Sequence, residues 1–315
     1  MKIYRGVEQL TDSPGHAVVT IGNFDGVHLG HQRIIALALE KARARGGVAI
    51  AFTFRPHPQV ALRPQVSLPL LSTYDEKLEL LAGLGLDMAI EQPFSREFST
   101  IQPEQFFRDI LLRRLNAEAI VVGYDFGFGK GRGGHLEVLQ ELCDSAGVEL
   151  TVVQPQREDS EVVSSSRVRS YLLAGEVDQA ARLLGRAFSY KGVVRKGDGR
   201  GRQIGFPTAN LKLDNKLALP NGVYTTETDF AGKRYASITN IGVRPTFAGA
   251  SPVPDEFPAW VETHLLDTDV DLYGSALTVK FVKRLRAEMK FAGVNELVTQ
   301  IRRDIDECRK VLSLP

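Results

Sequence analysis

Between residues 17 and 153 short apolar runs alternate with amphipathic segments, and this alternation limits the possible folds more than any other feature of the chain. The apolar runs have the length of strands: Ala17–Gly22, Val48–Phe54, Asp87–Glu91, Ala119–Gly123 and Val148–Val153. Helical spacing of apolar residues marks the segments between them, over 31–45, 75–84, 103–115 and 134–146. Apolar strands separated by helices predict an α/β domain whose parallel sheet is covered on both faces. Ligands of such sheets bind at the carboxyl ends of the strands.

After residue 160 the pattern changes to shorter elements. Two short helices are expected over Ser166–Ala174 and Val177–Gly185, and strand-like runs separated by turn residues follow them. These runs are Tyr190–Arg195, Gly222–Glu227, Arg234–Asn240, Trp260–Leu265 and Leu277–Val282. Their spacing predicts a small antiparallel β-barrel, and a final amphipathic helix over 293–311 is expected to pack on it. We therefore expect two domains, 1–185 and 186–315.

The composition is that of a globular protein and argues against several functional classes. Lys and Arg number 39 against 38 Asp and Glu, so the chain lacks a general positive field for a nucleic-acid backbone. The first residues do not resemble a secretory signal, and no stretch has the length of a membrane span. Cys143 and Cys308 are far apart and predict buried free thiols. We expect a cytoplasmic protein with no nucleic-acid or membrane partner.

The segment GNFDGVHLGHQ, Gly22–Gln32, joins the first predicted strand to the first predicted helix. Backbone N–H groups in such a turn point at whatever lies there, and the helix dipole favours an anion. The glycines permit close approach of a phosphate, and His28 and His31 are spaced so that both rings can donate to its oxygens. For two histidines alone, a helix cap and a packed ring are the better interpretation. Strand, glycines and helix together favour a phosphate site.

Serines and an arginine form the second candidate phosphate site. Ser164, Ser165 and Ser166 precede a predicted helix, where hydroxyls cap the N-terminus, and Arg169 carries a fork of N–H groups suited to phosphate. Taken alone, the segment is better explained as a helix cap with a solvated arginine.

A third segment, Val122–Gly129 or VGYDFGFG, follows a predicted strand. Asp125 at the strand end is placed to orient a substrate, and Phe126 and Phe128 are able to pack on a flat ring. A glycine-rich turn with core aromatic residues is an equally good interpretation.

Residues 186–210 form a basic, glycine-rich segment, RAFSYKGVVRKGDGRGRQIGFPTAN. Asp198 is its single acid, and its glycines allow the backbone to approach an anion. This composition suits a phosphate, and a solvated hairpin is the alternative.

Several segments of the first half resemble one family. Gly22–His31 resembles the HxGH signature of nucleotidyltransferases, in the form found in bacterial bifunctional riboflavin kinase/FAD synthetases. Val163–Arg169 resembles the family's ISSTxIR motif with Ser166 in place of Thr, and Val122–Gly129 resembles its VGxDFxFG segment. The resemblance implies a Rossmann-like FMN adenylyltransferase domain in which His28 and His31 are catalytic. It implies ATP binding by Gly22, Asn23, Phe24, Gly30, Ser164, Ser165, Ser166 and Arg169, and flavin binding by Asp125, Phe126 and Phe128.

In the second half, Gly205–Asn210 or GFPTAN resembles the PTAN motif of riboflavin kinases. The resemblance implies that Thr208 and Asn210 coordinate Mg²⁺ between ATP phosphates, a task suited to hard oxygen ligands. It also implies phosphate binding by Gly199, Arg202 and Gly205. Glu262 corresponds to the general base that takes the proton of the riboflavin 5′-hydroxyl. By itself, a Glu in a strand most often faces solvent.

The chain departs from the family at two places. Arg55 stands where relatives commonly carry an acid before a proline, and the segment Ala248–Ala259 is somewhat longer than usual. His264 shares the alternation phase of Glu262 and receives no role.

The resemblance covers essentially the whole chain and implies two reactions. Riboflavin and ATP give FMN and ADP, and FMN and ATP then give FAD and pyrophosphate, with Mg²⁺ accompanying ATP. Three alternatives remain: a relative with one activity, a nucleic-acid-modifying protein, because class I tRNA synthetases share the HxGH signature, and a flavin sensor without turnover. Intact motifs argue against the first, and near-neutral charge argues against the second.

Overall fold

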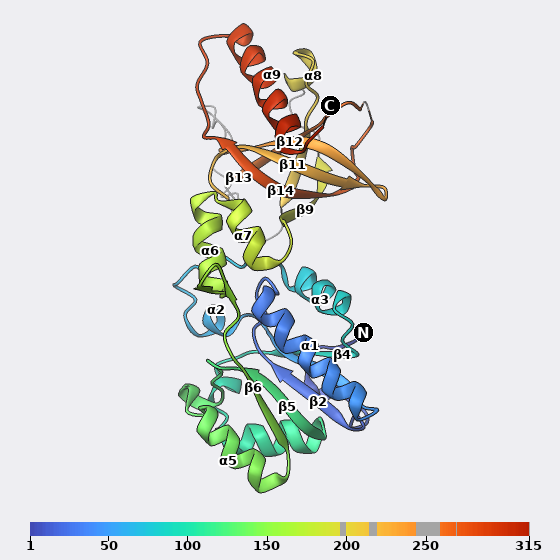
Figure 1. Ribbon diagram of the computed structural model, residues 1–315, viewed down its shortest axis with the longest axis vertical. Helices are drawn as coiled ribbons and strands as arrows, with labels where there is room; N and C mark the ends of the chain where they lie inside the picture. Colours follow the sequence, from blue (N-terminus) through green and yellow to red (C-terminus); the bar gives the residue numbers. More distant parts are fainter. Residues whose placement is uncertain (196–199, 214–218, 244–258, 269, 315) are drawn as a thin grey trace. The chain divides into compact units, whose positions relative to one another are not determined.

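The computed structural model describes residues 1–315 except 196–199, 214–218, 244–258, 269 and 315 (Figure 1). The chain forms two compact units, Met1–Ser165 and Ser166–Pro315. Helix α6, Ser165–Ala174, begins at this division. The predicted boundary at 185/186 divides the chain by activity and not by compactness, and it stays a prediction.

A six-stranded parallel sheet forms the centre of the first unit, with the strand order β1-β4-β3-β2-β5-β6. Its strands are β1 (Lys2–Tyr4), β2 (Ala17–Ile21), β3 (Val48–Arg55), β4 (Met88–Pro93), β5 (Ala117–Gly123) and β6 (Glu149–Val153). All five residues of β2 are buried, as expected for a central strand covered on both faces. A small hairpin of β7 (Arg157–Glu158) and β8 (Glu161–Val162) follows.

Two hydrophobic clusters lie on opposite faces of this sheet. Val18 and its face of the sheet pack against α1 (Leu29–Ala44) and α3 (Tyr74–Gly83). Val19 and the other face pack against α5 (Leu136–Ala146) and a π-helix, Phe106–Arg114, which follows α4 (Pro103–Gln105). Successive residues of β2 therefore belong to different clusters, because strand side chains alternate in direction.

A closed antiparallel barrel forms the centre of the second unit, with the strand order β10-β13-β12-β11-β14-β9. Its strands are β9 (Phe188–Arg195), β10 (Ala209–Leu213), β11 (Gly222–Phe230), β12 (Lys233–Val243), β13 (Ala259–Leu265) and β14 (Ala276–Arg286). The helices of this unit are α6, α7 (Val177–Leu184), the short α8 (Arg200–Gln203) and α9 (Val294–Val311).

Helix α9 lies against the barrel, as predicted (Figure 1). Cys308 of α9 packs with Val223, Ile238 and Leu266, and the Arg286 guanidinium pairs with the Asp304 carboxylate at 2.6 Å. The first residue of the helix, Val294, is 58% exposed, so the apolar stripe does not extend to its start.

The barrel buries both aromatic rings and hydroxyl groups. Tyr224 meets Phe281 edge-on at 5.4 Å, and burial raises the pKa of Tyr224 to about 12. Fully buried hydroxyls form one chain of hydrogen bonds that are 2.8 to 2.9 Å long, in the order Thr228, Ser237, Thr226, Thr239 and Thr263. Each hydroxyl thereby finds a partner inside the protein, which avoids the cost of a buried unpaired group.

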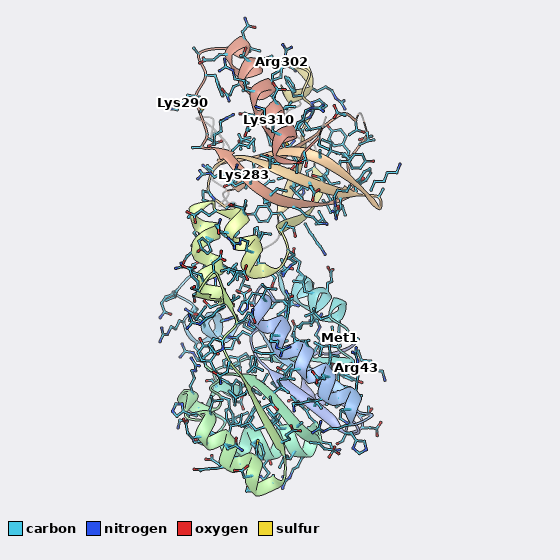
Figure 2. All side chains as sticks on the ribbon, viewed as in Figure 1. Met1, Arg43, Lys283, Lys290, Arg302 and Lys310 are labelled. Atoms are coloured by element: carbon cyan, nitrogen blue, oxygen red, sulfur yellow. The ribbon has the colours of Figure 1, made fainter. Side chains whose placement is uncertain are left out.

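The predicted strands and helices are confirmed, with boundaries shifted by a few residues. Four strands of the described residues were missed, the short β1, β7 and β8 and the barrel strand β10. Both predicted free thiols, Cys143 and Cys308, are buried and unbridged. In the described ranges no helix is long and apolar enough to cross a membrane. Basic side chains lie in the last turns of two helices, Arg43 in α1 and Lys310 in α9, where they face the negative end of the helix dipole (Figure 2).

Candidate active sites

The turn between β2 and α1 has an unusual backbone. Phe24 and Val27 have positive φ angles of 51° and 42°, in a region that costs a bulky residue about 1–3 kcal/mol. The neighbouring loop holds this conformation. The Asp25 carboxylate accepts hydrogen bonds from the N–H groups of Leu71 at 2.9 Å and Ser72 at 3.3 Å. A strained turn secured from outside its own sequence is typical of a functional site.

His28 and His31 lie together at the start of α1. Their rings stack at a centroid distance of 3.6 Å, and the edge of Phe24 meets His31 at 5.3 Å. His28 is also the helix cap, because its Nδ1 accepts the N–H of His31 at 3.4 Å. The neutral His28 ring therefore carries its proton on Nε2. From the sequence, a helix cap and a functional histidine pair were alternative interpretations. In the structure His28 caps the helix and also stacks on His31.

His31 is held in its neutral form. Burial lowers the pKa of His31 well below the usual value, and the charge of His28 when it is protonated and that of Lys77 lower it further. The Nδ1 atom of His31 is buried and has no hydrogen-bond partner within the described part of the chain. At neutral pH His31 thus acts as an uncharged imidazole with one N–H and one lone pair.

The serine segment packs against this turn. The Ser165 hydroxyl donates to the carbonyl of Asp25 at 3.0 Å. A Cβ atom at Gly30 would lie 3.2 Å from the His28 ring and 3.7 Å from the Val163 carbonyl, so Gly30 allows the turn and the serine segment to meet. Gly22 has a similar role beside the Phe24 ring, at 3.1 Å. The structure therefore joins two of the segments that the sequence suggested for ATP.

The rest of that motif continues into α6. Ser164 comes directly before the helix, Ser166 lies in its first turn, and Arg169 lies one turn further on. The carbonyl of Ser166 accepts a hydrogen bond from the Ser170 hydroxyl at 3.1 Å. The hydroxyl side chains and Arg169 thus follow one another along a single helix start.

Lys77 is a buried cation that the sequence interpretation missed. Its Nζ donates to Thr53 Oγ1 at 2.9 Å and to the Phe54 carbonyl at 3.1 Å, and the Thr53 hydroxyl donates to the Asn23 carbonyl at 3.2 Å. Burial lowers the pKa of Lys77 to about 8, although the Asp25 carboxylate opposes the shift. The sequence contains a signal of this burial. Lys77 lies on the same helix face as Leu81, and an apolar residue is expected on that face.

Arg55 belongs to a network of charges beside Lys77. Its guanidinium lies 3.4 Å from the Asp75 carboxylate and stacks on the Tyr74 ring at 4.9 Å. The buried Glu91 carboxylate pairs with Arg5 and lies 3.7 Å from Arg55. Arg55 therefore lies between two acids from neighbouring elements, Asp75 of α3 and Glu91 of β4.

The VGYDFGFG segment forms a turn at the end of β5. Asp125 is exposed, and its carbonyl accepts a hydrogen bond from Arg132 at 2.9 Å. Phe126 and Phe128 stack at 5.5 Å, and Phe128 is only 7% exposed and contacts Phe106. Phe128 thus belongs to the core, while Asp125 and Phe126 lie nearer the surface.

In the second unit, strand pairing brings Asn210 and Glu262 together. Asn210 of β10 lies opposite Glu262 of β13, and Asn240 of β12 lies opposite Glu262 on its other side. Directly opposite residues in an antiparallel pair have Cβ atoms about 5 Å apart. Asn210 is 7% exposed, and its Oδ1 is buried without a hydrogen-bond partner among the described residues. That oxygen has a lone pair available for a ligand.

The PTAN segment borders a cavity. Thr208 and Arg202 line it together with Thr263 and Asp271. Gly205 has φ +88°, which suits glycine. Gly199 lies outside the described residues.

Comparisons with known proteins match both halves of the chain to described families. The family model described as FAD synthetase matches residues 10–167, and the model described as riboflavin kinase matches residues 184–312. A bifunctional riboflavin kinase/FMN adenylyltransferase of Bacillus subtilis (strain 168) is 36% identical over 307 residues, 96% of this chain and 95% of that protein. The protein of the same description from Escherichia coli (strain K12) is 36% identical over 316 residues, 100% of this chain and 99% of its own.

A solved structure has the same fold over nearly the whole chain. It is described as a macrolide-efflux protein from Streptococcus pneumoniae, and it matches with a TM-score of 0.87 and 30% identity over 98% of both chains.

Proposed function

The chain belongs to the bifunctional riboflavin kinase/FMN adenylyltransferase family, and from this premise we propose how its two sites divide the reactions. It phosphorylates riboflavin with ATP to give FMN and ADP, and it joins FMN to a second ATP to give FAD and pyrophosphate. We assign FAD formation to residues 1–185 and FMN formation to residues 186–315. The two family matches, 10–167 and 184–312, support this division.

For FAD formation we assign the catalytic roles to His28 and His31. A phosphate oxygen of FMN attacks the α-phosphorus of ATP, the bond to the bridging oxygen breaks, and the electron pair leaves with pyrophosphate. This transfer needs positioned N–H donors rather than a covalent nucleophile. The neutral imidazoles and the backbone of Gly22, Asn23, Phe24 and Gly30 supply them, and Ser164, Ser165, Ser166 and Arg169 complete the phosphate site.

The flavin of FMN is assigned to the end of β5. Asp125 and Phe126 lie near the surface there, and Phe128 supports Phe126 from the core. Parallel sheets bind ligands at this edge, next to the β2–α1 turn.

For FMN formation we assign the general base to Glu262. Its carboxylate takes the proton of the riboflavin 5′-hydroxyl as that oxygen attacks the γ-phosphorus, and ADP leaves with the electron pair of the broken bond. We assign the ATP phosphates to Gly199, Arg202 and Gly205. Arg202 lines the cavity together with Thr208, and Gly199 lies outside the described residues.

Thr208 and Asn210 fit Mg²⁺, which accompanies ATP and neutralises phosphate charge when bound. The supporting observation is the buried Asn210 Oδ1, which has no hydrogen bond to another described residue and therefore keeps a lone pair for a ligand. Over the described part of the chain no cluster of three His, Cys, Asp or Glu side chains is arranged for a metal. An ion held by Thr208 and Asn210 would complete its shell with phosphate and water oxygens.

The juxtaposition of Asn210 and Glu262 carries the assignment of the kinase site. Incubating the protein with riboflavin, ATP and Mg²⁺ and separating the flavins tests the whole proposal. We expect FMN first and FAD later, with ADP and pyrophosphate in equal amounts once all FMN is converted. Bound riboflavin that stays unchanged would identify a sensor, and FMN without FAD would identify a single activity.

We also propose a cytoplasmic location without nucleic-acid or membrane partners. The buried free thiols of Cys143 and Cys308 and the near-neutral net charge of +1 support it. Fractionation of cells that express the protein tests the location.

A further inference from the structure

His264 lies on β13 near the candidate base, and neither reaction as described above uses it. It follows Glu262 by two residues, and both side chains are partly exposed. Val261, Thr263 and Leu265 are buried on the opposite side of the strand. Because side chains alternate along a strand, His264 and Glu262 face the same way.

The ring of His264 contacts the segment that leads to the candidate metal ligands. Its Nδ1 lies 2.7 Å from the Pro207 carbonyl oxygen, and its ring meets the Phe206 ring edge-on at 5.8 Å and 84°. A carbonyl oxygen only accepts, so Nδ1 must carry the proton and donate it. His264 is thereby a hydrogen-bond donor to the peptide that precedes Thr208.

This hydrogen bond holds the peptide that leads into Thr208. The peptide bond is planar, so the direction of the Pro207 carbonyl also sets the plane of the Thr208 nitrogen. Pro207 has no N–H with which to join a ladder. On the other flank the Phe206 N–H donates to the Gly201 carbonyl at 2.8 Å. The bond from His264 therefore secures the side that adjoins Thr208.

Thr208 and Asn210 differ in how the barrel holds them. Asn210 is paired on both sides, with Glu262 of β13 and with Arg195 of β9. Thr208 lies just before the first residue of β10, outside both registers. A metal ligand outside the ladder needs another restraint, because two ligands bind one ion well only when both are held in place.

We propose that His264 is a positioning residue of the kinase site. Its Nδ1–H fixes the Pro207–Thr208 peptide, so that Thr208 and Asn210 present their oxygens to the same Mg²⁺. The inference rests on the proposed function, in which these two residues bind the metal that accompanies ATP. His264 itself does not touch the substrate in this role.

Two substitutions in the full chain separate the hydrogen bond from the bulk of the ring. The amide nitrogen of Asn reaches the position of the histidine Nδ1 and donates in the same direction, whereas Leu fills similar space without a donor. We expect His264→Leu to raise the KM for Mg²⁺·ATP in riboflavin phosphorylation about tenfold, since one hydrogen bond corresponds to about that factor. We expect kcat to fall less than KM rises, and His264→Asn to stay near the wild-type values.

Hydrogen exchange gives a readout that does not depend on turnover. Peptides spanning 205–213 should exchange faster in His264→Leu than in the wild type, and His264→Asn should retain the protection. The conversion of supplied FMN to FAD takes place at the other proposed site, so both variants should perform it at the wild-type rate.

Two results would overturn the inference. One is a Leu variant with wild-type KM and wild-type exchange over 205–213, and the other is an Asn variant as defective as the Leu variant. If His264→Leu unfolds the whole barrel, hydrogen exchange rises in every barrel peptide. His264→Asn then still shows whether a restored donor restores the KM and the protection of 205–213. Asn210→Ala tests the metal assignment separately. If this variant forms FMN at the wild-type rate and with the wild-type Mg²⁺ dependence, the proposed metal site is wrong, whereas the contact of His264 with Pro207 is unaffected.

Discussion

We assign ATP phosphates to both candidate sites, yet the side chains of the two sites differ in charge and in how they are fixed. The first unit places His28, His31 and the buried Lys77 around one strained turn. The second unit places Asn210 and Glu262 on neighbouring strands, with Thr208 just before the first of them, and Arg202 of its cavity is exposed. A site with its own N–H donors and buried cation is suited to expel pyrophosphate, whereas a site of neutral and acidic oxygens needs a metal ion to balance phosphate charge.

Separating the two units is expected to have the largest effect on the two activities. A fragment Ser166–Pro315 lacks His28 and His31, so we expect FMN from riboflavin and no FAD at all. The shorter fragment Arg186–Pro315 also lacks α7, which packs on β9 and β14. We expect it to make FMN but to be less stable by several kcal/mol, because the barrel loses contact with the buried Leu183 and Leu184, at about 1.5–3 kcal/mol each.

Flavin products and urea unfolding of both fragments check this prediction. FAD formation by either fragment would contradict the assignment to the first unit. If only the longer fragment makes FMN, the kinase domain begins before residue 186.

Replacing both histidines tests the donor chemistry of the first site. We expect His28→Ala with His31→Ala to lower the rate of FAD formation from FMN about ten-thousandfold, taking about a hundredfold for each lost donor. Riboflavin phosphorylation should be unchanged, because it takes place in the other unit. Steady-state rates with FMN and with riboflavin provide the measurement.

His28→Asn is the matched control for the lost helix cap. Its side-chain oxygen still accepts the N–H of His31, which preserves a cap worth about 1 kcal/mol, but the Nε2 donor is gone. Normal FAD formation in the double variant would show that the histidines only shape the turn.

Removing the base tests the second site with a smaller expected effect. We expect Glu262→Gln to lower kcat for FMN formation about a thousandfold, because general base catalysis contributes about 10²–10⁴. Gln keeps the shape of Glu262 and its strand position but cannot take the proton. Supplied FMN should still become FAD, and a wild-type rate of FMN formation would mean that another group is the base.

The smallest effect is on the stability of the first unit, through the pKa of Lys77. That pKa is about 8 in the folded protein and 10.5 ordinarily, so between these values the unfolded chain binds more protons. Stability should therefore rise with pH across this window, by about 3 kcal/mol in total for this group. Below about pH 8 both states are protonated and the burial penalty is present in full.

Calorimetric melting of the wild type and of Lys77→Met between pH 7.5 and 10 tests whether stability rises with pH. The wild type should gain stability relative to the variant as pH rises, because Met has no proton to lose. Parallel curves would mean that Lys77 is not desolvated as the structure indicates.

Elements of the fold that depend on a few consecutive residues were predictable from the sequence. The apolar run of β2, the turn after it and α1 are contiguous, and the structure confirms all three as elements. β10 was missed because ANLKL has few residues and carries Asn210 and Lys212 within it. Its strand character comes from pairing with β9 and β13, which lie far away in sequence.

The candidate sites were predictable only as separate motifs. Spacing and composition identified His28, His31, Thr208 and Asn210. The contact of Ser165 with Asp25 spans 140 positions, so no local pattern contains it. Lys77 and His264 were missed as site residues for the same reason, since their partners are supplied by other elements.

The sequence by itself determined most of the strands and helices in their order, the two-part architecture and the family's motifs, because hydrophobic periodicity and turn chemistry act over a few neighbouring residues. Tertiary structure alone decided which charges are buried, which strands are paired and which hydrogen bonds hold the motifs in place. Burial lowers the pKa values of His31 and Lys77, and strand register sets Asn210 against Glu262. Solvent exclusion and register depend on contacts between distant segments, and only the folded chain brings those segments together.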